Sequence, residues 1–348
     1  MKKLKLGVIF GGMSTENEVS CVSAVSVIKN LNREKYDIYP IYIDKKGEWF
    51  EVLNIKENEK KGEELEDKNL IDNVIDFLRS LDIIFPVLHG LYGEDGTIQG
   101  MFELLKIPYV GCGVLASSIG MDKVYSKIIF DKAGINQTKY VYIRKNSGNY
   151  IFVDENFNEK NFNIDELVDA IVDELKFPMF VKPSNSGSSV GISKVKSKEE
   201  LRIAVEKASE FDRKILIEEE IFGREVECAV LGNEDVLNSC VGEIKSAEEF
   251  YSYDAKYNNQ ESKTLIPADI SKEKSDEIQK LAVKAFKAID GKGLSRVDFF
   301  IEENTGKVYI NEINTLPGFT SISMYPKLFE SLGIKYTELL DKLIEMAL

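Results

Sequence analysis

The chain has 348 residues, of which 43% are hydrophobic and 30% are charged, and its formal net charge is −14. The acidic surplus repels phosphate backbones, and the apolar runs are far shorter than the roughly 18 residues of a membrane span, so neither nucleic acid nor membrane is an expected partner. The four cysteines form no C-x-x-C pair, which predicts reduced thiols, a cytoplasmic location and no zinc site. The length is enough for two or three domains of roughly 100–200 residues.

Residues 1–115 alternate strand and helix signals. The segments "KLKLGVIF", "DIYPIYI", "LDIIFPVL" and "IPYVGC" predict strands, and "TIQGMFELLK" predicts a helix between two of them. This alternation indicates a doubly wound parallel sheet, whose ligands lie beyond the carboxyl ends of the strands. Glu16 and His89, the only histidine, follow two of these strand ends. Glu16 either complements the dipole of the next helix or holds a ligand ammonium.

Residues 116–212 begin with a predicted helix, "MDKVYSKIIFDKAGI", and a polar segment follows it. Two further strands, "FPMFVKP" and "VGISKV", are joined by "SNSGSS", and Lys182 ends the first of them. A glycine-bearing loop of this kind can close backbone amides and the hydroxyls of Ser188 and Ser189 around phosphate oxygens. An ordinary hairpin is the alternative, and the P-loop pattern G-x-x-x-x-G-K-[ST] is absent.

Residues 213–348 begin with two predicted strands, "KILIEEEI" and "EVECAVLG", and continue through a loop-rich stretch to a long helix and a hairpin. The acidic run Glu218 to Glu220 is either a solvated face or a segment that offers backbone groups to a base and a carboxylate to ribose hydroxyls.

The hairpin "SRVDFFIEENTGKVYINEIN" carries polar side chains at alternate positions. Arg296 and Asp298 share one face of its first strand, and Glu312 and Asn314 share one face of its second. If the two faces coincide, they gather oxygen ligands of the kind that Mg²⁺ prefers. The alternative is the solvated outer face of an edge hairpin.

Together these segments resemble the D-alanine–D-alanine ligases of the ATP-grasp superfamily. The resemblance covers nearly the whole chain, except a polar insert at about residues 144–163, and runs through "GGMSTENEVS", "HGLYGEDGTIQG", "MDKVYSK", "FVKPSNSGSSVGIS", "GREVECAVLG", "FYSYDAKY", "SRVDFF" and "NEINTLPGFTSISMYP". It implies an α/β fold of the α+β ATP-grasp kind. Residues 1–115 would form a Rossmann-like substrate domain with a doubly wound parallel sheet. Two antiparallel-sheet ATP-grasp domains would follow: a central one at 116–212 and a catalytic one at 213–348, with a mobile loop at about 243–267.

The family pattern implies a role for each matching residue. Contacts with ATP are implied for Lys123, Lys182, Ser189, Glu218, Glu219, Glu220, Ile221 and Glu225. Two Mg²⁺ or Mn²⁺ ions are implied at Asp298, Glu312 and Asn314. Catalytic roles are implied for Glu16, Ser188, Tyr257, Arg296, Gly318 and Ser323. Contacts with the amino-acid substrates are implied for His89, Tyr253, Lys256 and Met324.

The resemblance also implies a reaction. ATP phosphorylates the carboxylate of one D-alanine, and the amine of a second D-alanine attacks the acyl phosphate. The product, D-alanyl-D-alanine, serves peptidoglycan precursor synthesis. A homodimer is common in the family and is expected here.

Three alternatives stay open. "GGMSTENEVS" and "FPVLHG" also resemble one branch of the D-alanine–D-serine ligases of vancomycin resistance. Another ATP-grasp carboxylate–amine ligase, or a nucleotide-binding protein without turnover, would share many of these residues. D-serine relatives tend to carry arginine where this chain has Met324, and a methionine wall suits a methyl group, so D-alanine is the predicted second substrate. Ile322 departs from the family, whose members often have histidine there.

Overall fold

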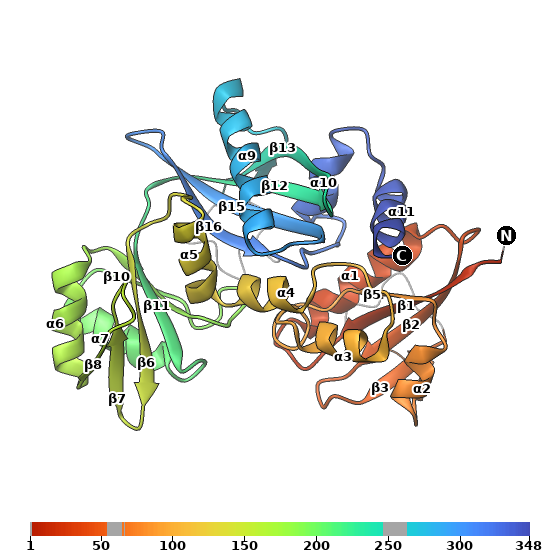
Figure 1. Ribbon diagram of the computed structural model, residues 1–348, viewed down its shortest axis with the longest axis horizontal. Coiled ribbons are helices and arrows are strands. Elements are labelled where there is room, and N and C mark those ends of the chain that lie inside the picture. The colour runs from red at the N-terminus through yellow and green to blue at the C-terminus, as the bar shows by residue number, and fades with distance from the viewer. Residues whose placement is uncertain (1, 54–64, 66, 246–262) are drawn as a thin grey trace.

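The computed structural model describes residues 2–53, 65, 67–245 and 263–348, which form three β-sheets with helices packed on them (Figure 1). The first sheet has the order β4-β3-β2-β1-β5, with strands at Lys68–Leu70, Trp49–Val52, Tyr36–Ile43, Leu4–Gly11 and Ile83–Pro86. β1 pairs in parallel with β2 and β5, whereas β3 and β4 add antiparallel at one edge. The predicted fold class is confirmed, and the antiparallel edge is an addition that sequence analysis missed.

Helices cover both faces of the first sheet, because side chains of β1 alternate between the faces. Leu6 and Val8 pack against α1 (Asn17–Asn30), and Ile9 packs against α2 (Val74–Arg79) and α3 (Thr97–Leu105). This is the doubly wound arrangement. The expected strand "IPYVGC" does not form, since the chain there makes only an isolated bridge between Tyr109 and Ile84.

The second sheet is antiparallel, with the order β10-β9-β11-β6-β7-β8. Its strands are Ser193–Val195, Met179–Pro183, Lys214–Glu219, Tyr140–Asn146, Asn149–Val153 and Glu159–Phe162. α6 (Ile164–Glu174) and α7 (Lys198–Ala208) cover one face with a buried aliphatic cluster. β11 pairs inside this sheet although it follows residue 212, so the chain passes to the third sheet between Glu219 and Gly223.

The third sheet is also antiparallel, with the order β14-β13-β12-β15-β16. Its strands are Lys263–Leu265, Val236–Lys245, Gly223–Gly232, Gly293–Glu302 and Val308–Asn314. α9 (Lys272–Ala288) covers one face. α10 (Met324–Glu330) and α11 (Tyr336–Ala347) pack against the other face and also against the first sheet, so one buried cluster joins the two sheets.

α4 (Val114–Met121) leads into α5 (Lys123–Lys132), which contacts both the second and the third sheet (Figure 1). The start of α5 is fixed by its N-cap, Asp122, whose carboxylate accepts hydrogen bonds from the amides of Val124 and Tyr125. Among the described residues, no helix has both the length and the apolar character that crossing a membrane requires.

Candidate active site

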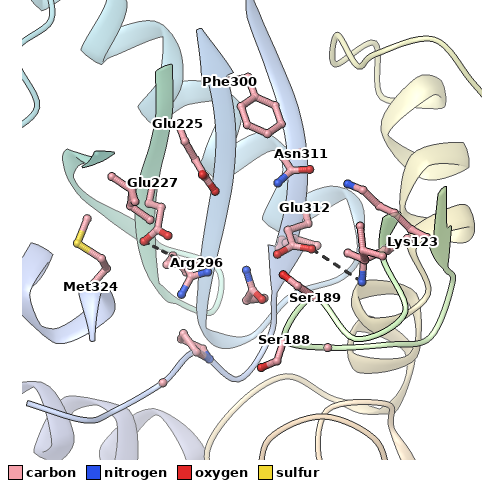
Figure 2. Close-up of a pocket in the computed structure, with 18 of the residues that line it drawn as sticks. Lys123, Ser188, Ser189, Glu225, Glu227, Arg296, Phe300, Asn311, Glu312 and Met324 are labelled. Carbon is pink, nitrogen blue, oxygen red and sulfur yellow. Dashed lines mark ion pairs between the residues drawn. The ribbon is translucent and has the colours of Figure 1, made fainter. Parts of the chain in front are cut away.

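A cavity of about 670 Å³ lies where segments from all three sheets meet. The turn after β1, the loop after β9 and the linker between β11 and β12 line it, together with β15, β16 and the segment that leads to α10. Figure 2 shows Arg296 and Glu312 projecting from the third sheet toward this space, with Lys123 facing Glu312 from α5. Most of the predicted site residues therefore share one cavity.

Glu16 and Ser188 meet across the boundary between the first and second sheets. The Ser188 hydroxyl donates a hydrogen bond to Oε1 of Glu16. The approach depends on Gly187, because a Cβ there would lie 2.4 Å from Oε2 of Glu16. Ser188 and Ser189 have φ values of 47° and 61°, a left-handed conformation that non-glycine residues adopt at a cost of about 1–3 kcal/mol each.

His89 lies beside this contact and is buried. Its Nε2 is 3.1 Å from the Ser23 hydroxyl, and its Nδ1 is 3.4 Å from Oε1 of Glu94. Burial alone would lower the pKa of His89, but the hydrogen bond and the charge of Glu94, with a further contribution from Glu16, raise it overall. The imidazole is thus held by two side chains at the edge of the cavity.

Lys182 does not stand free in the cavity but pairs with a buried carboxylate. Its Nζ is 2.5 Å from Oε1 of Glu218, while Nζ of Lys127 is 2.8 Å from Oε2 of Glu218. Burial would raise the pKa of Glu218, but the two lysines outweigh it and lower this pKa to about 2. Lys123 donates to the Ser186 carbonyl at 2.6 Å and lies 3.9 Å from Oε2 of Glu312.

The linker after β11 presents both side chains and backbone to the cavity. Nζ of Lys194 is 2.8 Å from Oε1 of Glu220. The amides of Glu219 and Glu220 donate to the carbonyls of Lys139 and Pro178. Ile221 lines the cavity too, and the structure records no hydrogen bond from its backbone to any described residue. Glu225, the third residue of β12, lines the cavity as well.

Three carboxylates form a row across neighbouring strands of the third sheet. Asp298 is the register partner of Glu227 on β12 and of Glu312 on β16, and Arg296 is the partner of Asn314. The two polar faces of the hairpin therefore coincide, as predicted. Arg296 donates two hydrogen bonds to Asp298, at 2.8 and 2.7 Å, and its Nε is 3.1 Å from Oε2 of Glu227. Burial alone would lower the pKa of Arg296, but the charges of Asp298 and Glu227 outweigh burial and raise this pKa overall.

The predicted metal ligands have the oxygen chemistry that a hard divalent cation prefers. Glu312 and Asn314 line the cavity, whereas Asp298 is buried and is not among the residues that line it. Asp298 and Glu312 are cross-strand partners, and the Asn314 amide donates to Asp298 at 3.0 Å. Carboxylate and amide oxygens suit Mg²⁺ or Mn²⁺, which commonly complete their shells with water and substrate phosphates. In the described chain no three His, Cys, Asp or Glu side chains form a metal-binding group by themselves.

The segment before α10 forms the remaining wall. The Ser323 hydroxyl accepts a hydrogen bond from the Thr320 amide at 3.0 Å, and a Cβ at Gly318 would lie 2.9 Å from this hydroxyl oxygen. Met324 is buried and meets β13 so closely that a Cβ at Gly242 would lie 2.4 Å from its methyl carbon. Ile322 is 55% exposed. The predicted Tyr253, Lys256 and Tyr257 lie outside the described residues.

Sequence reasoning missed two buried residues of this site, Lys127 and Glu227. Lys127 follows Lys123 by one helical turn in "MDKVYSK", a spacing that places both on one side of α5. Glu227 follows Glu225 by two positions on a strand, which places both on one face. These spacings were visible, but only the structure shows that Glu218 and Arg296 are their partners.

Comparisons with known proteins agree over the whole chain. Residues 5–112 match the model of the D-ala D-ala ligase N-terminus, and residues 129–345 match that of the D-ala D-ala ligase C-terminus. The chain is 50% identical to a D-alanine--D-alanine ligase of Acetivibrio thermocellus, covering 99% of this chain and 96% of that protein. It is 49% identical to a D-alanine--D-alanine ligase of Clostridium novyi, covering 100% and 98%.

Comparison with solved structures also finds ligases that act on D-alanine. The VanG D-Ala:D-Ser ligase from Enterococcus faecalis is similar with a TM-score of 0.86 and 40% identity, over 100% of both chains. The D-alanine-D-alanine ligase from Coxiella burnetii is similar with a TM-score of 0.80 and 32% identity, over 100% of this chain and 94% of that one. On both the sequence and the structural comparisons, the chain belongs to the D-alanine–D-alanine ligase family.

Proposed function

We propose that this protein is an ATP-dependent ligase that joins two D-alanines into D-alanyl-D-alanine for peptidoglycan precursor synthesis. The observation that carries the proposal is the single cavity that holds Lys123, Lys182, Arg296 and Glu312, in a chain 50% identical to a D-alanine--D-alanine ligase. Cations and carboxylates that converge in this way suit the transfer of a phosphoryl group to a carboxylate.

The nucleotide occupies the space between the second and third sheets. Lys123 and Lys182 contact its phosphates, and the loop that carries Ser189 closes beside them. Glu218 and the linker residues Glu219, Glu220 and Ile221 receive adenine, and Glu225 receives the ribose hydroxyls. The backbone of Ile221 supports this placement, because it makes no hydrogen bond to a described residue and lines the cavity, so that it can bond to the edge of a base.

Asp298, Glu312 and Asn314 hold two Mg²⁺ or Mn²⁺ ions in this proposal. Such ions neutralise charge on a transferred phosphoryl group. Arg296, which contacts Asp298, stays beside that group and stabilises the oxyanion that forms when the second amine attacks, together with the Gly318 amide.

The amino-acid substrates lie between the first sheet and the segment before α10. Glu16 faces the ammonium of the first D-alanine, with His89 beside it, and Ser188 fixes the carboxylate of Glu16 through their hydrogen bond. Ser323 holds the carboxylate of the second D-alanine. An acyl phosphate between these groups has to be kept from water, which the enclosing walls of three sheets favour.

D-alanine is the proposed second substrate, and D-serine is the rival. The similarity to the VanG D-Ala:D-Ser ligase is the observation that favours the rival. Met324 favours D-alanine, because its buried thioether offers no hydrogen-bond donor to a serine hydroxyl. A different ATP-grasp acceptor, or nucleotide binding without turnover, is a further outcome that product analysis would reveal.

The proposal includes three features of the whole protein: three domains that correspond to the three sheets, a homodimer and a cytoplasmic location. The free state of all four cysteines fits the last of these. Light scattering of the purified protein tests the dimer, which a mass of one 39.4 kDa chain would contradict.

The deciding experiment identifies products by mass after incubation with ATP, Mg²⁺ and D-alanine, D-serine or both. We expect D-alanyl-D-alanine with one ADP per dipeptide, and D-alanine incorporated in preference to D-serine when both compete. Arg296→Lys, which keeps a cation beside Asp298 and Glu227, should strongly reduce dipeptide formation while the protein stays folded. Predominant D-alanyl-D-serine would replace our substrate assignment, and ATP binding without any product would refute the ligase.

A further inference from the structure

Glu218 is bound by two lysines through different oxygens. Lys182 contacts Oε1 at 2.5 Å, and Lys127 contacts Oε2 at 2.8 Å. All three side chains are largely withdrawn from water, with 12%, 3% and 5% of the surfaces of Lys182, Lys127 and Glu218 exposed. The two lysines and the carboxylate together carry a net charge of +1, which is unusual at a buried position in a chain of net charge −14.

Glu218 has an aromatic residue beside it on each of the two neighbouring strands, and each ring contacts one of the two lysines. Tyr140 on β6 and Phe180 on β9 are the cross-strand partners of Glu218. Nζ of Lys127 lies 5.1 Å from the ring centre of Tyr140, and Nζ of Lys182 lies 5.6 Å from that of Phe180. Each lysine is thus fixed by the carboxylate and by an aromatic face.

The two lysines differ in their access to the cavity. Lys182 is one of the residues that line it, whereas Lys127 is not. Lys127 comes from α5, one turn beyond Lys123, and contacts the oxygen of Glu218 that Lys182 does not contact. An anion that enters the cavity can therefore reach Lys182 but not Lys127.

We propose that Lys127 is a positioning residue, a permanent counter-ion of Glu218 that allows Lys182 to move from this carboxylate to the phosphates of a bound nucleotide. This inference rests on the proposed function, because it takes the nucleotide as the ligand of the cavity. A buried carboxylate that loses its only partner is strongly destabilised, whereas one that keeps a second ammonium on its other oxygen is not. Without Lys127, nucleotide binding has to break the last ion pair of Glu218.

The charged and titratable groups around Glu218 determine how the site responds to the removal of one lysine. They are Lys127 from α5, Lys182 from β9 and Tyr140 from β6; Glu225 and Glu312 act on Lys182 from the third sheet. In Lys127→Met, Glu218 keeps Lys182 in the free protein. When the nucleotide draws Lys182 away, Glu218 is left buried without a cation and takes up a proton.

The test is isothermal titration of the full-length protein with Mg²⁺ and a non-hydrolysable ATP analogue at pH 7, in two buffers of different ionisation enthalpy. We expect Lys127→Met to bind roughly tenfold to a hundredfold more weakly than the wild type. Binding to this variant should also take up close to one proton, which the wild type should not do at Glu218. Lys132→Met is the matched control, because it removes one exposed lysine from the same helix and should bind as the wild type does.

A second pair of variants separates this role from a packing defect. Glu218→Gln removes the group that needs a counter-ion, so adding Lys127→Met to it should weaken binding far less than Lys127→Met weakens it in the wild type, and proton uptake should vanish. Equal loss in both backgrounds, or unchanged affinity without proton uptake in Lys127→Met, would overturn the inference while leaving nucleotide binding intact. A wild-type protein that does not bind the analogue would overturn the proposed function and this inference together.

Discussion

Gly187 leaves no room for a side chain beside Glu16. An added Cβ would lie 2.4 Å from Oε2 of Glu16, so in Gly187→Ala either the carboxylate of Glu16 or the loop has to shift, and the contact between Ser188 and Glu16 is disturbed. We expect kcat/KM for D-alanine to fall about tenfold or more, which corresponds to about 1.4 kcal/mol of transition-state stabilisation. Steady-state ADP release at varied D-alanine measures this effect.

Gly100→Ala is the matched control for that substitution. Gly100 lies inside α3, and an added Cβ there meets no atom within 4 Å. Because alanine favours a helix interior over glycine by roughly 1 kcal/mol, we expect a slightly more stable protein with wild-type kinetics. If Gly187→Ala were as active as Gly100→Ala, the proposed role of the loop against Glu16 would be wrong.

Glu218 should make stability depend on pH in a defined window. Its folded pKa of about 2 lies below the ordinary 4.5, so the ionised form stabilises the fold above pH 4.5 and this contribution is lost as the pH falls toward 2. At neutral pH we expect Glu218→Gln to lower the free energy of unfolding by about 3 kcal/mol. In urea titrations, the difference in unfolding free energy between Glu218→Gln and the wild type should become smaller as the pH falls from 4.5 toward 2. The exposed Glu303→Gln is the control, and its unfolding free energy should stay close to that of the wild type at every pH.

At the level of single residues, the sequence predicts which side chains matter better than how they are paired. Strand alternation correctly places Arg296 with Asp298, and Glu312 with Asn314. It does not show that Lys182 is held by Glu218, because that contact joins two strands whose register is set by the whole sheet. The left-handed backbone of Ser188 and Ser189 is equally hidden, since serine ordinarily avoids it.

The start of α5 shows how one helix end positions Lys123, a cation predicted to bind ATP. Asp122 accepts from the Ser184 hydroxyl at 2.6 Å and pairs with Lys214, while the Lys123 amide donates to the Ser184 carbonyl at 3.0 Å. The burial of Asp122 opposes ionisation, but Lys214 and Ser184 lower its pKa overall. The helix is therefore tied to β9 and β11 immediately before Lys123.

Replacing Asp122 should loosen both the fold and the proposed nucleotide site. Asp122→Ala removes the N-cap and leaves Lys214 buried without this partner, so we expect a loss of about 3–5 kcal/mol in unfolding free energy. KM for ATP should rise more than kcat falls, because Lys123 loses its position. Asp122→Asn retains a capping side chain and should lose less; equal stability of the alanine variant and the wild type would contradict this account.

Among elements, long periodic segments were predicted well and short or polar ones poorly. β1, β2 and α9 form where their hydrophobic patterns indicate. The edge strands β3 and β4 were missed because strands of four and three residues carry too little alternation. "IPYVGC" has a strand's composition, yet only Tyr109 pairs with Ile84, which reflects the path of the chain and not local preference.

The whole molecule is held by buried clusters that do not follow the order of the chain. One cluster joins β1 and α1 of the first sheet to β12 of the third through α10 and α11, whereas the core of the second sheet is separate. α11 packs against α1, which lies more than 300 residues earlier in the chain, and also against β5, β12 and β15. The cavity lies where these units meet, so its walls depend on contacts that no local pattern encodes.

This arrangement predicts that the first and third sheets unfold together. Leu340 of α11 is fully buried in the shared cluster, so Leu340→Ala should lower the unfolding free energy by about 2–5 kcal/mol. The only tryptophan, Trp49, lies on β3 of the first sheet. In Leu340→Ala, the unfolding transition seen by Trp49 fluorescence and the one seen by far-ultraviolet circular dichroism should both move to a lower urea concentration. Leu167→Ala, in the separate core of the second sheet, should shift the circular dichroism and leave the Trp49 transition nearly in place. If Leu340→Ala also left the Trp49 transition unchanged, α11 would not couple the two sheets.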